Sequence, residues 1–425
     1  MTKILSKSKG FTNNFALCAL HFALKKGSDS VKILLVSQHF YPDNFRVNDI
    51  AKELVAKGHD VTVITSLPDY ATGKVPADCK GRENRETEWN GVKVIRTFSV
   101  ERRSGLIFRM LNYVSFFLSS TLKALSLKEK FDVVMCYQTS PVLMANGAKA
   151  YAKKHNIPFF VYCLDLWPES LKAWHVGEGN PLFKLMNKYS MSVYNSADKV
   201  GVTSKPFMNY LHTVNDVPMD KLVYLPQHAE PLDLNEKAKS DNVVFAFGGN
   251  IGSVQNIECI IRAVAEIRDS EGFSVEIYGD GSELANCKKL SSELGTDEKI
   301  TFFGRVTWDE LKEKYNNADA FLLTLKPEGI IGQTVPAKLQ EYMSGGRTVI
   351  ASIDGAAKEI IEESKCGICV PADDHEALAD AMKYFVENRD KFGSCEQNGK
   401  KYFNENFTRE KFITDLENHF QSIMK

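Results

Sequence analysis

Short apolar runs alternate with helical stretches along this chain from residue 31 onward. Residues 33–36 and 61–64 are predicted to be buried strands. Between them lies one helical face that Gly58 ends, formed by Ile50, Ala51, Leu54 and Val55. A strand, a helix and a second strand in so short a stretch form a βαβ unit, which requires a parallel sheet.

The same alternation continues through both halves of the chain. In the first half, further strands are expected at residues 92–96, 132–136, 158–163, 199–203 and 222–225, before a polar stretch at 230–242. In the second half, strands are expected at residues 243–247, 275–278, 300–303, 320–324, 348–351 and 367–370. The helices expected with them are residues 256–268, 309–317, 336–344, 356–363 and 409–424.

These elements predict an α/β protein with two Rossmann-like, doubly wound parallel-sheet lobes that face a cleft. We place an N-terminal extension at residues 1–30, a first lobe at 31–228, a second lobe at 229–408 and a C-terminal helix at 409–425. Ligands are expected at the carboxyl ends of the strands, where such sheets bind them.

The extension carries Lys3, Lys7 and Lys9 before an apolar run at residues 15–24. This order resembles a signal peptide, although His21 interrupts the run and no small-x-small cleavage site follows. A start codon assigned too early, with the true initiator near residue 31, is the alternative explanation.

Composition narrows the class of protein. Hydrophobic residues make up 44% of the 425 and charged residues 25%, which excludes disordered, collagenous and fibrous proteins. Lys and Arg number 53 against 54 Asp and Glu, so we expect no nucleic-acid partner. Nine cysteines without regular spacing indicate a reduced, cytoplasmic protein rather than a secreted disulfide framework. Cys366 and Cys369 lack two further zinc ligands nearby, so we expect core thiols and no metal.

Three glycine-containing turns follow strands of the second half. Backbone N–H groups in such turns approach diphosphates closely, and a following helix adds partial positive charge. Simple steric turns are the alternative explanation for each. The candidate residues are Gly249, Asn250, Ile251 and Gly252 in the first turn, Asp280 and Gly281 in the second, and Arg305 and Val306 in the third.

The stretch at residues 334–343 holds the most informative charged pair. Lys338 and Glu341 are three residues apart and therefore share one face of a helix, which Pro336 begins. We interpret Lys338 as a phosphate contact and Glu341 as a contact to a pair of ribose or sugar hydroxyls. A solvated surface ion pair is the alternative. Thr334 and Ala337 belong to the same candidate site.

Taken in this order, the motifs of the second half resemble those of the retaining glycosyltransferases of family four, which have the GT-B fold. The resemblance rests on the turn at residues 279–281, the segment 302–306 and the run 341–346. In the first half, residues 38–44, 69–73 and 165–170 resemble bacterial O-antigen and capsule enzymes, including the L-fucosamine-transferase type. The resemblance implies retention of anomeric configuration, a UDP-linked nucleotide-sugar donor, and no cofactor or metal.

The chain departs from the family pattern at the diphosphate. Asn250 and Gln255 stand where the family usually has an Arg and a Lys. Gln333 stands where the first of two glutamates is expected, and Glu328 lies five residues before it. Of the family's two glutamates, only the second is therefore matched with assurance, by Glu341. Backbone amides, Lys338 or another residue must neutralise the charge of the diphosphate.

The first lobe is expected to hold the acceptor. Asp165 follows the strand at 158–163, where many relatives place a His beside the reacting sugar, and it is our catalytic candidate together with Glu341. Capping of the next turn is the alternative role for Asp165. Further acceptor-side candidates are His39, Tyr41, Asn44, Arg46, Trp167 and Glu169.

An apolar, aromatic helix near residues 106–118 is flanked by Arg102, Arg103, Arg109 and Lys123. Packing in the core is one reading of this helix, and contact with an anionic membrane surface is the other.

We therefore expect a peripheral enzyme on the inner face of the plasma membrane, acting on a lipid-linked (polyprenyl diphosphate) saccharide. A nucleotide-sugar epimerase and a two-lobed periplasmic binding protein are the rival functions.

Overall fold

The computed structural model describes residues 30–424, except 71–72, 82–83, 104, 236, 238–239, 328 and 330–333. The extension predicted at residues 1–30 therefore lies outside the described residues but for Ser30. The chain forms two compact units. The first comprises residues up to 202, 211–223 and 416–425, and the second comprises 203–210 and 224–415. The C-terminal helix is shared between them.

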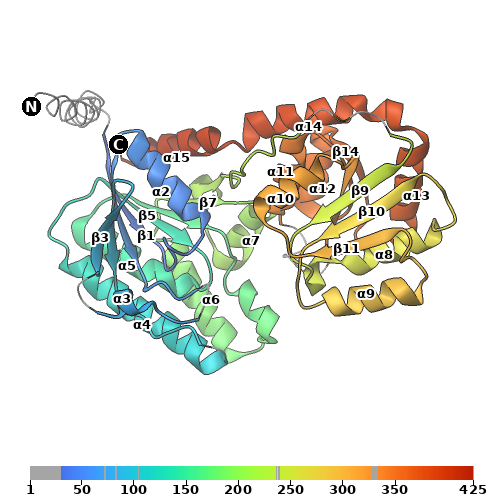
Figure 1. Ribbon diagram of the computed structural model, residues 1–425. Helices are drawn as coiled ribbons and strands as arrows, with labels where there is room; N and C mark the ends of the chain where they lie inside the picture. The colour runs from blue at the N-terminus through green and yellow to red at the C-terminus, as the bar shows by residue number, and fades with distance from the viewer. Residues whose placement is uncertain are drawn as a thin grey trace, which may run out of the picture. The chain divides into compact units, whose positions relative to one another are not determined.

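The first unit is built on an eight-stranded sheet in the order β3-β4-β2-β1-β5-β6-β7-β8 (Figure 1). Its strands are β1 (Lys32–Val36), β2 (Asp60–Thr65), β3 (Glu86–Trp89), β4 (Val92–Arg96), β5 (Val133–Gln138), β6 (Phe159–Cys163), β7 (Lys199–Val202) and β8 (Leu222–Tyr224). The pairs from β4 through β7 are parallel, and β3 pairs antiparallel with β4. The chain changes direction across the sheet between β1 and β5, which makes the carboxyl ends of these strands the expected place for a ligand.

The second unit has a six-stranded parallel sheet in the order β11-β10-β9-β12-β13-β14. Its strands are β9 (Val243–Gly248), β10 (Phe273–Tyr278), β11 (Ile300–Gly304), β12 (Ala320–Thr324), β13 (Thr348–Ser352) and β14 (Gly367–Val370). This is the strand order of dinucleotide-binding sheets, with the switch point between β9 and β12.

Helices follow most of the parallel strands in both units. In chain order they are α2 (Arg46–Ala56), α3 (Ala77–Lys80), α4 (Leu106–Ser126), α5 (Asn146–His155), α6 (Pro181–Tyr194), α7 (Lys205–Asn215), α8 (Ile257–Glu266), α9 (Leu284–Glu293), α10 (Trp308–Tyr315), α11 (Ala337–Gly345), α12 (Gly355–Ser364), α13 (His375–Glu387), α14 (Gly393–Asn406) and α15 (Arg409–Ile423). Among the described residues, none of these helices has the length and apolar character needed to cross a membrane.

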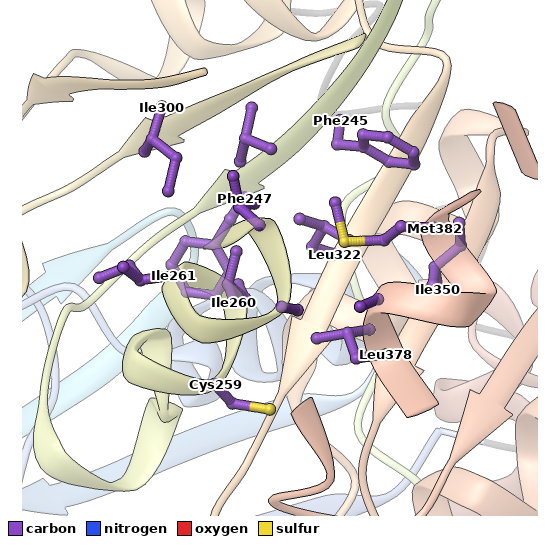
Figure 2. Packing of buried hydrophobic residues seen from close by; sticks show 14 of the residues in the cluster. Phe245, Phe247, Cys259, Ile260, Ile261, Ile300, Leu322, Ile350, Leu378 and Met382 are labelled. Carbon is purple, nitrogen blue, oxygen red and sulfur yellow. The ribbon is translucent and has the colours of Figure 1, made fainter. Parts of the chain in front are cut away.

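Side chains of the second sheet alternate between two cores, because successive residues of a strand point to opposite faces. Phe245 and Phe247 belong to one buried cluster, and Ala246 between them belongs to the other. Figure 2 shows Ile260 and Ile261 of α8 beside Phe247, with Leu378 and Met382 of α13 beside Leu322 and Ile350. The opposite face is covered by residues of α11, α12 and α14, so the unit has three layers.

The predicted α/β fold with two doubly wound sheets is confirmed. The strands at residues 92–96, 320–324 and 367–370 have the predicted bounds, and the others differ by a few residues at one end or both. Strand β3 was not predicted. Glu86, Thr87 and Glu88 are polar, so this segment lacks the apolar pattern of a buried strand.

Candidate functional site

The three glycine turns of the second unit are joined by backbone hydrogen bonds at the carboxyl ends of β9, β10 and β11. The N–H of Gly249 donates to the carbonyl of Tyr278 at 2.8 Å, and the N–H of Gly279 donates to the carbonyl of Gly304 at 2.8 Å. The N–H of Ile251 donates to the carbonyl of Asp280 at 2.9 Å. The turns therefore form one rigid rim rather than three separate loops.

Glycine is required at two positions of this rim. Gly249 has a φ of +133°, and a Cβ there would lie 2.3 Å from Cε of Lys338. Gly279 has a φ of +140°, and a Cβ there would lie 1.8 Å from the carbonyl oxygen of Gly249. Any larger residue would meet both backbone strain and a clash, so these glycines allow the turns and Lys338 to approach one another.

Lys338 lies in the first turn of α11, which follows the extended residue Pro336. Its Nζ atom is 3.8 Å from the centroid of the buried Phe247 ring. Burial lowers the pKa of Lys338 to about 7, while the charge of Glu341 opposes that decrease. The side chain is therefore held above the first glycine turn and is half-buried.

Glu341 lies on the same face of α11, is half-buried and has contacts of its own. The next residue, Tyr342, is fully buried, and its hydroxyl accepts a hydrogen bond from the N–H of Gly248 at 3.1 Å. This bond fixes α11 to the end of β9. The helix thereby carries Lys338 and Glu341 to the carboxyl edge of the sheet.

A pocket of about 360 Å³ opens beside this rim. The predicted residues Gly249, Asn250, Asp280, Arg305 and Val306 line it together, with Tyr278, Gly279 and Leu311. Gly281 packs its backbone against Ile251 in the adjoining turn. Thr334 is half-buried and Ala337 is the first residue of α11. Gln333 and Glu328 lie outside the described residues.

In the first unit, His39 and Asp69 follow β1 and β2 and are almost completely buried. The ring of His39 stacks on Phe45 with centroids 5.0 Å apart, and a guanidinium nitrogen of Arg102 lies 3.4 Å from its Nε2. Because a guanidinium can only donate, this contact requires Nε2 to accept and the proton to reside on Nδ1. Burial and the charge of Arg102 lower the pKa of His39 to about 3, so the ring is neutral.

The carboxylate of Asp69 accepts hydrogen bonds from the backbone N–H of Arg102 at 2.8 Å and from Nδ2 of Asn112 at 3.0 Å. Burial raises the pKa of Asp69 to about 6. Its second oxygen, Nδ1 of His39 and Oε1 of Gln38 are buried without a partner among the described residues. Three such atoms at one sheet edge indicate a functional site, because buried polar groups are otherwise hydrogen-bonded.

Asp165 lies two residues beyond β6 and is half-buried. Ser140 donates hydrogen bonds to its carboxylate, which oppose the burial that raises its pKa. Its backbone carbonyl accepts from Nε2 of Gln138 at 2.9 Å. The carboxylate is therefore anchored to the loop after β5, rather than held only by its own turn.

The other acceptor-side candidates occupy varied positions. Trp167 is buried, and its Nε1 donates to Oγ of Ser140 at 3.0 Å. Tyr41 is exposed and stacks on Trp89 with centroids 4.8 Å apart. Asn44 is exposed, Arg46 begins α2, and Glu169 pairs with Lys172 at 3.0 Å.

Two family models match the chain. The model described as "Glycosyl transferases group 1" matches residues 231–402. The model described as "Glycosyl transferase 4-like domain" matches residues 44–228. The two matches together cover the sheets of both units except strand β1. The chain belongs to the group 1 glycosyltransferases.

Known proteins are similar over most of this glycosyltransferase. The putative colanic acid biosynthesis glycosyl transferase WcaI of Escherichia coli is 23% identical, over 83% of this chain and 91% of its own length. The uncharacterized glycosyltransferase MJ1607 of Methanocaldococcus jannaschii is 25% identical, over 78% and 81%. The crystal structure of a glycosyltransferase from Rickettsia africae has a TM-score of 0.67 and 18% identity, over 93% of this chain and 99% of that one. The fold is GT-B.

The neutral residues in the first turn of this glycosyltransferase form a pair of their own. Nδ2 of Asn250 donates to Oε1 of Gln255 at 3.0 Å, and the N–H of Gly252 donates to the same oxygen at 3.2 Å. The pair shapes the turn but brings no positive charge. Lys338 therefore supplies a half-buried cation to this rim.

Sequence reasoning missed one basic residue here, Lys326. Its N–H donates to the carbonyl of Val254 at 2.9 Å, and it lines a second pocket with Gly252 and Ser253. Its place directly after β12, at the switch point of the sheet, is the signal that could have revealed it.

The four cations around α4 differ in their surroundings. Arg103 pairs with Glu101 at 2.9 Å and Lys123 pairs with Glu86 at 2.7 Å. Arg102 and Arg109 are half-buried against aromatic rings. Along the helix, one face leaves apolar side chains exposed: Ile107, Leu111, Val114, Leu118 and Leu122. Ile107 and Leu122, at its two ends, are 73% and 70% exposed.

Proposed function

We propose that this glycosyltransferase transfers a sugar from a nucleoside diphosphate sugar, UDP-linked, to a lipid-linked saccharide. The acceptor is a polyprenyl diphosphate saccharide used in surface polysaccharide synthesis, of the O-antigen or capsule kind. Transfer retains the anomeric configuration and requires no metal. Support for the polysaccharide comes from the similarity to WcaI, whose name places that protein in colanic acid biosynthesis.

One observation carries the donor side of the proposal. A half-buried lysine is held over a glycine turn whose backbone joins those of two further turns at the carboxyl edge of a parallel sheet. A diphosphate placed there meets backbone N–H groups and one ammonium. Such preorganised donors stabilise the charge that develops on a departing diphosphate. Glu341, one helical turn beyond Lys338, binds hydroxyl groups of the donor.

Asp165 provides the carboxylate on the acceptor side. It stabilises positive charge at the anomeric carbon or orients the acceptor hydroxyl as a base. The hydrogen bonds from Ser140 hold its carboxylate in a single orientation for this task. The first unit, which we propose binds the acceptor, also contains the other candidates: His39, Tyr41, Asn44, Arg46, Trp167 and Glu169.

The apolar face of α4 supports a position on the inner face of the plasma membrane. Exposed Ile107, Leu111, Val114, Leu118 and Leu122 recur every three or four residues and so form one stripe. A monomeric protein rarely exposes a continuous apolar stripe of this length without a use for it. Leu182 and Leu185 of α6 are exposed as well. Phe117 of α4 contacts Tyr189 of α6, so the two helices are neighbours.

The test is a transfer assay with a panel of radiolabelled UDP-sugars, including an N-acetyl-L-fucosamine donor, and a polyprenyl diphosphate saccharide. We expect labelled lipid product even when a chelator is present. NMR of the product should show the same anomeric configuration as in the donor. Free sugar released without any lipid acceptor would indicate a nucleotide-sugar epimerase instead. Absence of binding to every nucleotide sugar, by thermal shift, would contradict the proposal altogether.

A further inference from the structure

Two arginines of the first unit have aromatic partners in place of carboxylates. The guanidinium carbon of Arg102 lies 4.6 Å from the ring centroid of Tyr70, and that of Arg109 lies 5.9 Å from the ring centroid of Trp174. Within the described part of the chain, neither guanidinium forms an ion pair. Nε of Arg109 is buried without a hydrogen-bond partner. A ring face holds a guanidinium while leaving its N–H edge available for an anion.

Both arginines act on the same phenol. Tyr113 is buried on α4, one helical turn after Arg109 and on the same face. Burial raises the pKa of Tyr113, and the positive charges of Arg102 and Arg109 oppose that increase. The charge of Asp165 acts on this phenol in the other direction. Asn112, likewise about one helical turn after Arg109, connects this part of α4 to Arg102 through the carboxylate of Asp69.

The start of α4 adds to the positive potential. The helix begins at Leu106 without a side-chain cap, and its first turn contains Arg109 but no acidic residue. Unpaired N–H groups at a helix N-terminus favour anions. The apolar stripe of α4 begins at the same end, with Ile107 exposed. An anion bound here would therefore lie next to a surface suited to a hydrocarbon chain.

Neighbouring residues hold both the backbone and the guanidinium of Arg102 in place. Its N–H donates to the carboxylate of Asp69, which Asn112 holds, and its guanidinium contacts the neutral His39. Asp69 is thus a positioning residue that holds the backbone of Arg102. Bidentate guanidinium contacts suit the oxygens of a phosphate or diphosphate.

We infer that Arg102 and Arg109 bind the diphosphate of the lipid-linked acceptor. This inference rests on the proposed function for the identity of the acceptor, whereas the anion site itself does not. The inference assigns Arg102 and Arg109 to the diphosphate of the acceptor. Their positions in the sequence would also suit contact with the membrane surface.

The test measures the affinity of inorganic pyrophosphate by calorimetry in the Lys338→Ala protein, where the donor site lacks its half-buried cation. We expect about tenfold weaker binding for Arg102→Gln or Arg109→Gln and about a hundredfold for the double variant. Arg102→Lys keeps the positive charge but loses the parallel N–H donors of the guanidinium. Its affinity for pyrophosphate should therefore lie between those of the parent and Arg102→Gln. The matched control is Arg103→Gln, whose guanidinium is held by Glu101, and it should bind as its parent does. Near-ultraviolet circular dichroism checks that each variant is folded.

A second measurement distinguishes the acceptor from lipid headgroups. Flotation with vesicles of phosphatidylcholine and phosphatidylglycerol should be the same for the double variant and its parent. Equal pyrophosphate affinity in the double variant, or an equal loss in Arg103→Gln, would overturn the inference. So would loss of vesicle binding with pyrophosphate affinity intact, which would assign the arginines to headgroups. If pyrophosphate behaves as expected but no nucleotide sugar binds, the proposed function fails and the anion site remains.

Discussion

The ammonium of Lys338 lies 3.8 Å from the centroid of the Phe247 ring, although the two residues belong to different elements of the second unit. Phe247 lies near the end of β9, and Lys338 lies in the first turn of α11. A cation over an aromatic face is stabilised without a carboxylate partner. The lysine is therefore retained at the sheet edge while its N–H groups remain available to a phosphate.

Gly249 must be glycine for this contact to form. Gly249→Ala should weaken binding of a nucleotide sugar by more than about tenfold, because the new Cβ displaces Lys338, and it should strain the backbone by about 1–3 kcal/mol. Gly295→Ala is the matched control, since Gly295 also has a positive φ, of +64°, but nothing lies within 4 Å of its added Cβ. Calorimetry of both variants compares them. Equal affinities in Gly249→Ala and wild type would show that the turn is not part of the donor site.

Donor affinity should depend on pH through Lys338. Its pKa of about 7 lies below the ordinary 10.5, so the free protein loses this positive charge as pH rises through about 7. A bound diphosphate favours the charged form, so binding at about pH 8 should take up close to one proton, and affinity should fall by up to about tenfold per pH unit above 7. Calorimetry in buffers of different ionisation enthalpy measures the proton. Lys338→Arg should remove the dependence, and a persistent slope in that variant would exclude Lys338 as its origin.

Asp165→Asn should lower turnover by roughly 10²–10⁴-fold, the range for a positioned acid or base. Donor affinity should stay nearly unchanged, because Asp165 belongs to the first unit and the proposed donor site to the second. Burial raises its pKa, so turnover should fall at acid pH as the carboxylate becomes protonated. Steady-state kinetics at saturating donor and acceptor provide the check. Normal turnover of the Asn variant would leave Asp165 with a structural role only.

The stripe on α4 should decide attachment to lipid. Leu118→Glu combined with Leu122→Glu places two charges on its exposed face, where burial of each Leu otherwise contributes about 1.5–3 kcal/mol. We expect this variant to remain in solution in a flotation assay that carries wild type upward with the vesicles. The control is Lys289→Glu on the exposed face of α9, which should float as wild type does. Flotation of both variants would mean that α4 does not contact the membrane.

Much of the fold could be predicted from the sequence because buried parallel strands leave strong local patterns. The runs at 320–324 and 367–370 are apolar, short and bounded by turns, and their bounds were predictable to the residue. Strand β3 could not be predicted, because an exposed edge strand needs no apolar face. Helices α9 and α14 are also mostly polar, which weakens their period.

The candidate site was predictable where it depends on neighbours in sequence. Lys338 and Glu341 share a helix face by spacing alone, and the glycine turns follow strands. Contacts between distant segments could not be foreseen. Nothing near Arg102 in the sequence indicates that Asp69 and His39 hold it, and the place of Lys326 beside Gly252 depends on the strand order.

The proposed donor site is formed by Lys338 and Glu341 over the glycine turns. The most direct measurement is the affinity of the nucleotide sugar for Lys338→Ala and Glu341→Ala, by calorimetry at about pH 7. Each variant loses a charge-assisted contact, so we expect losses of about 1.5–3 kcal/mol, or roughly ten- to a hundredfold. Lys289→Ala should bind as wild type does. Wild-type affinity in both site variants would show that the nucleotide sugar binds elsewhere.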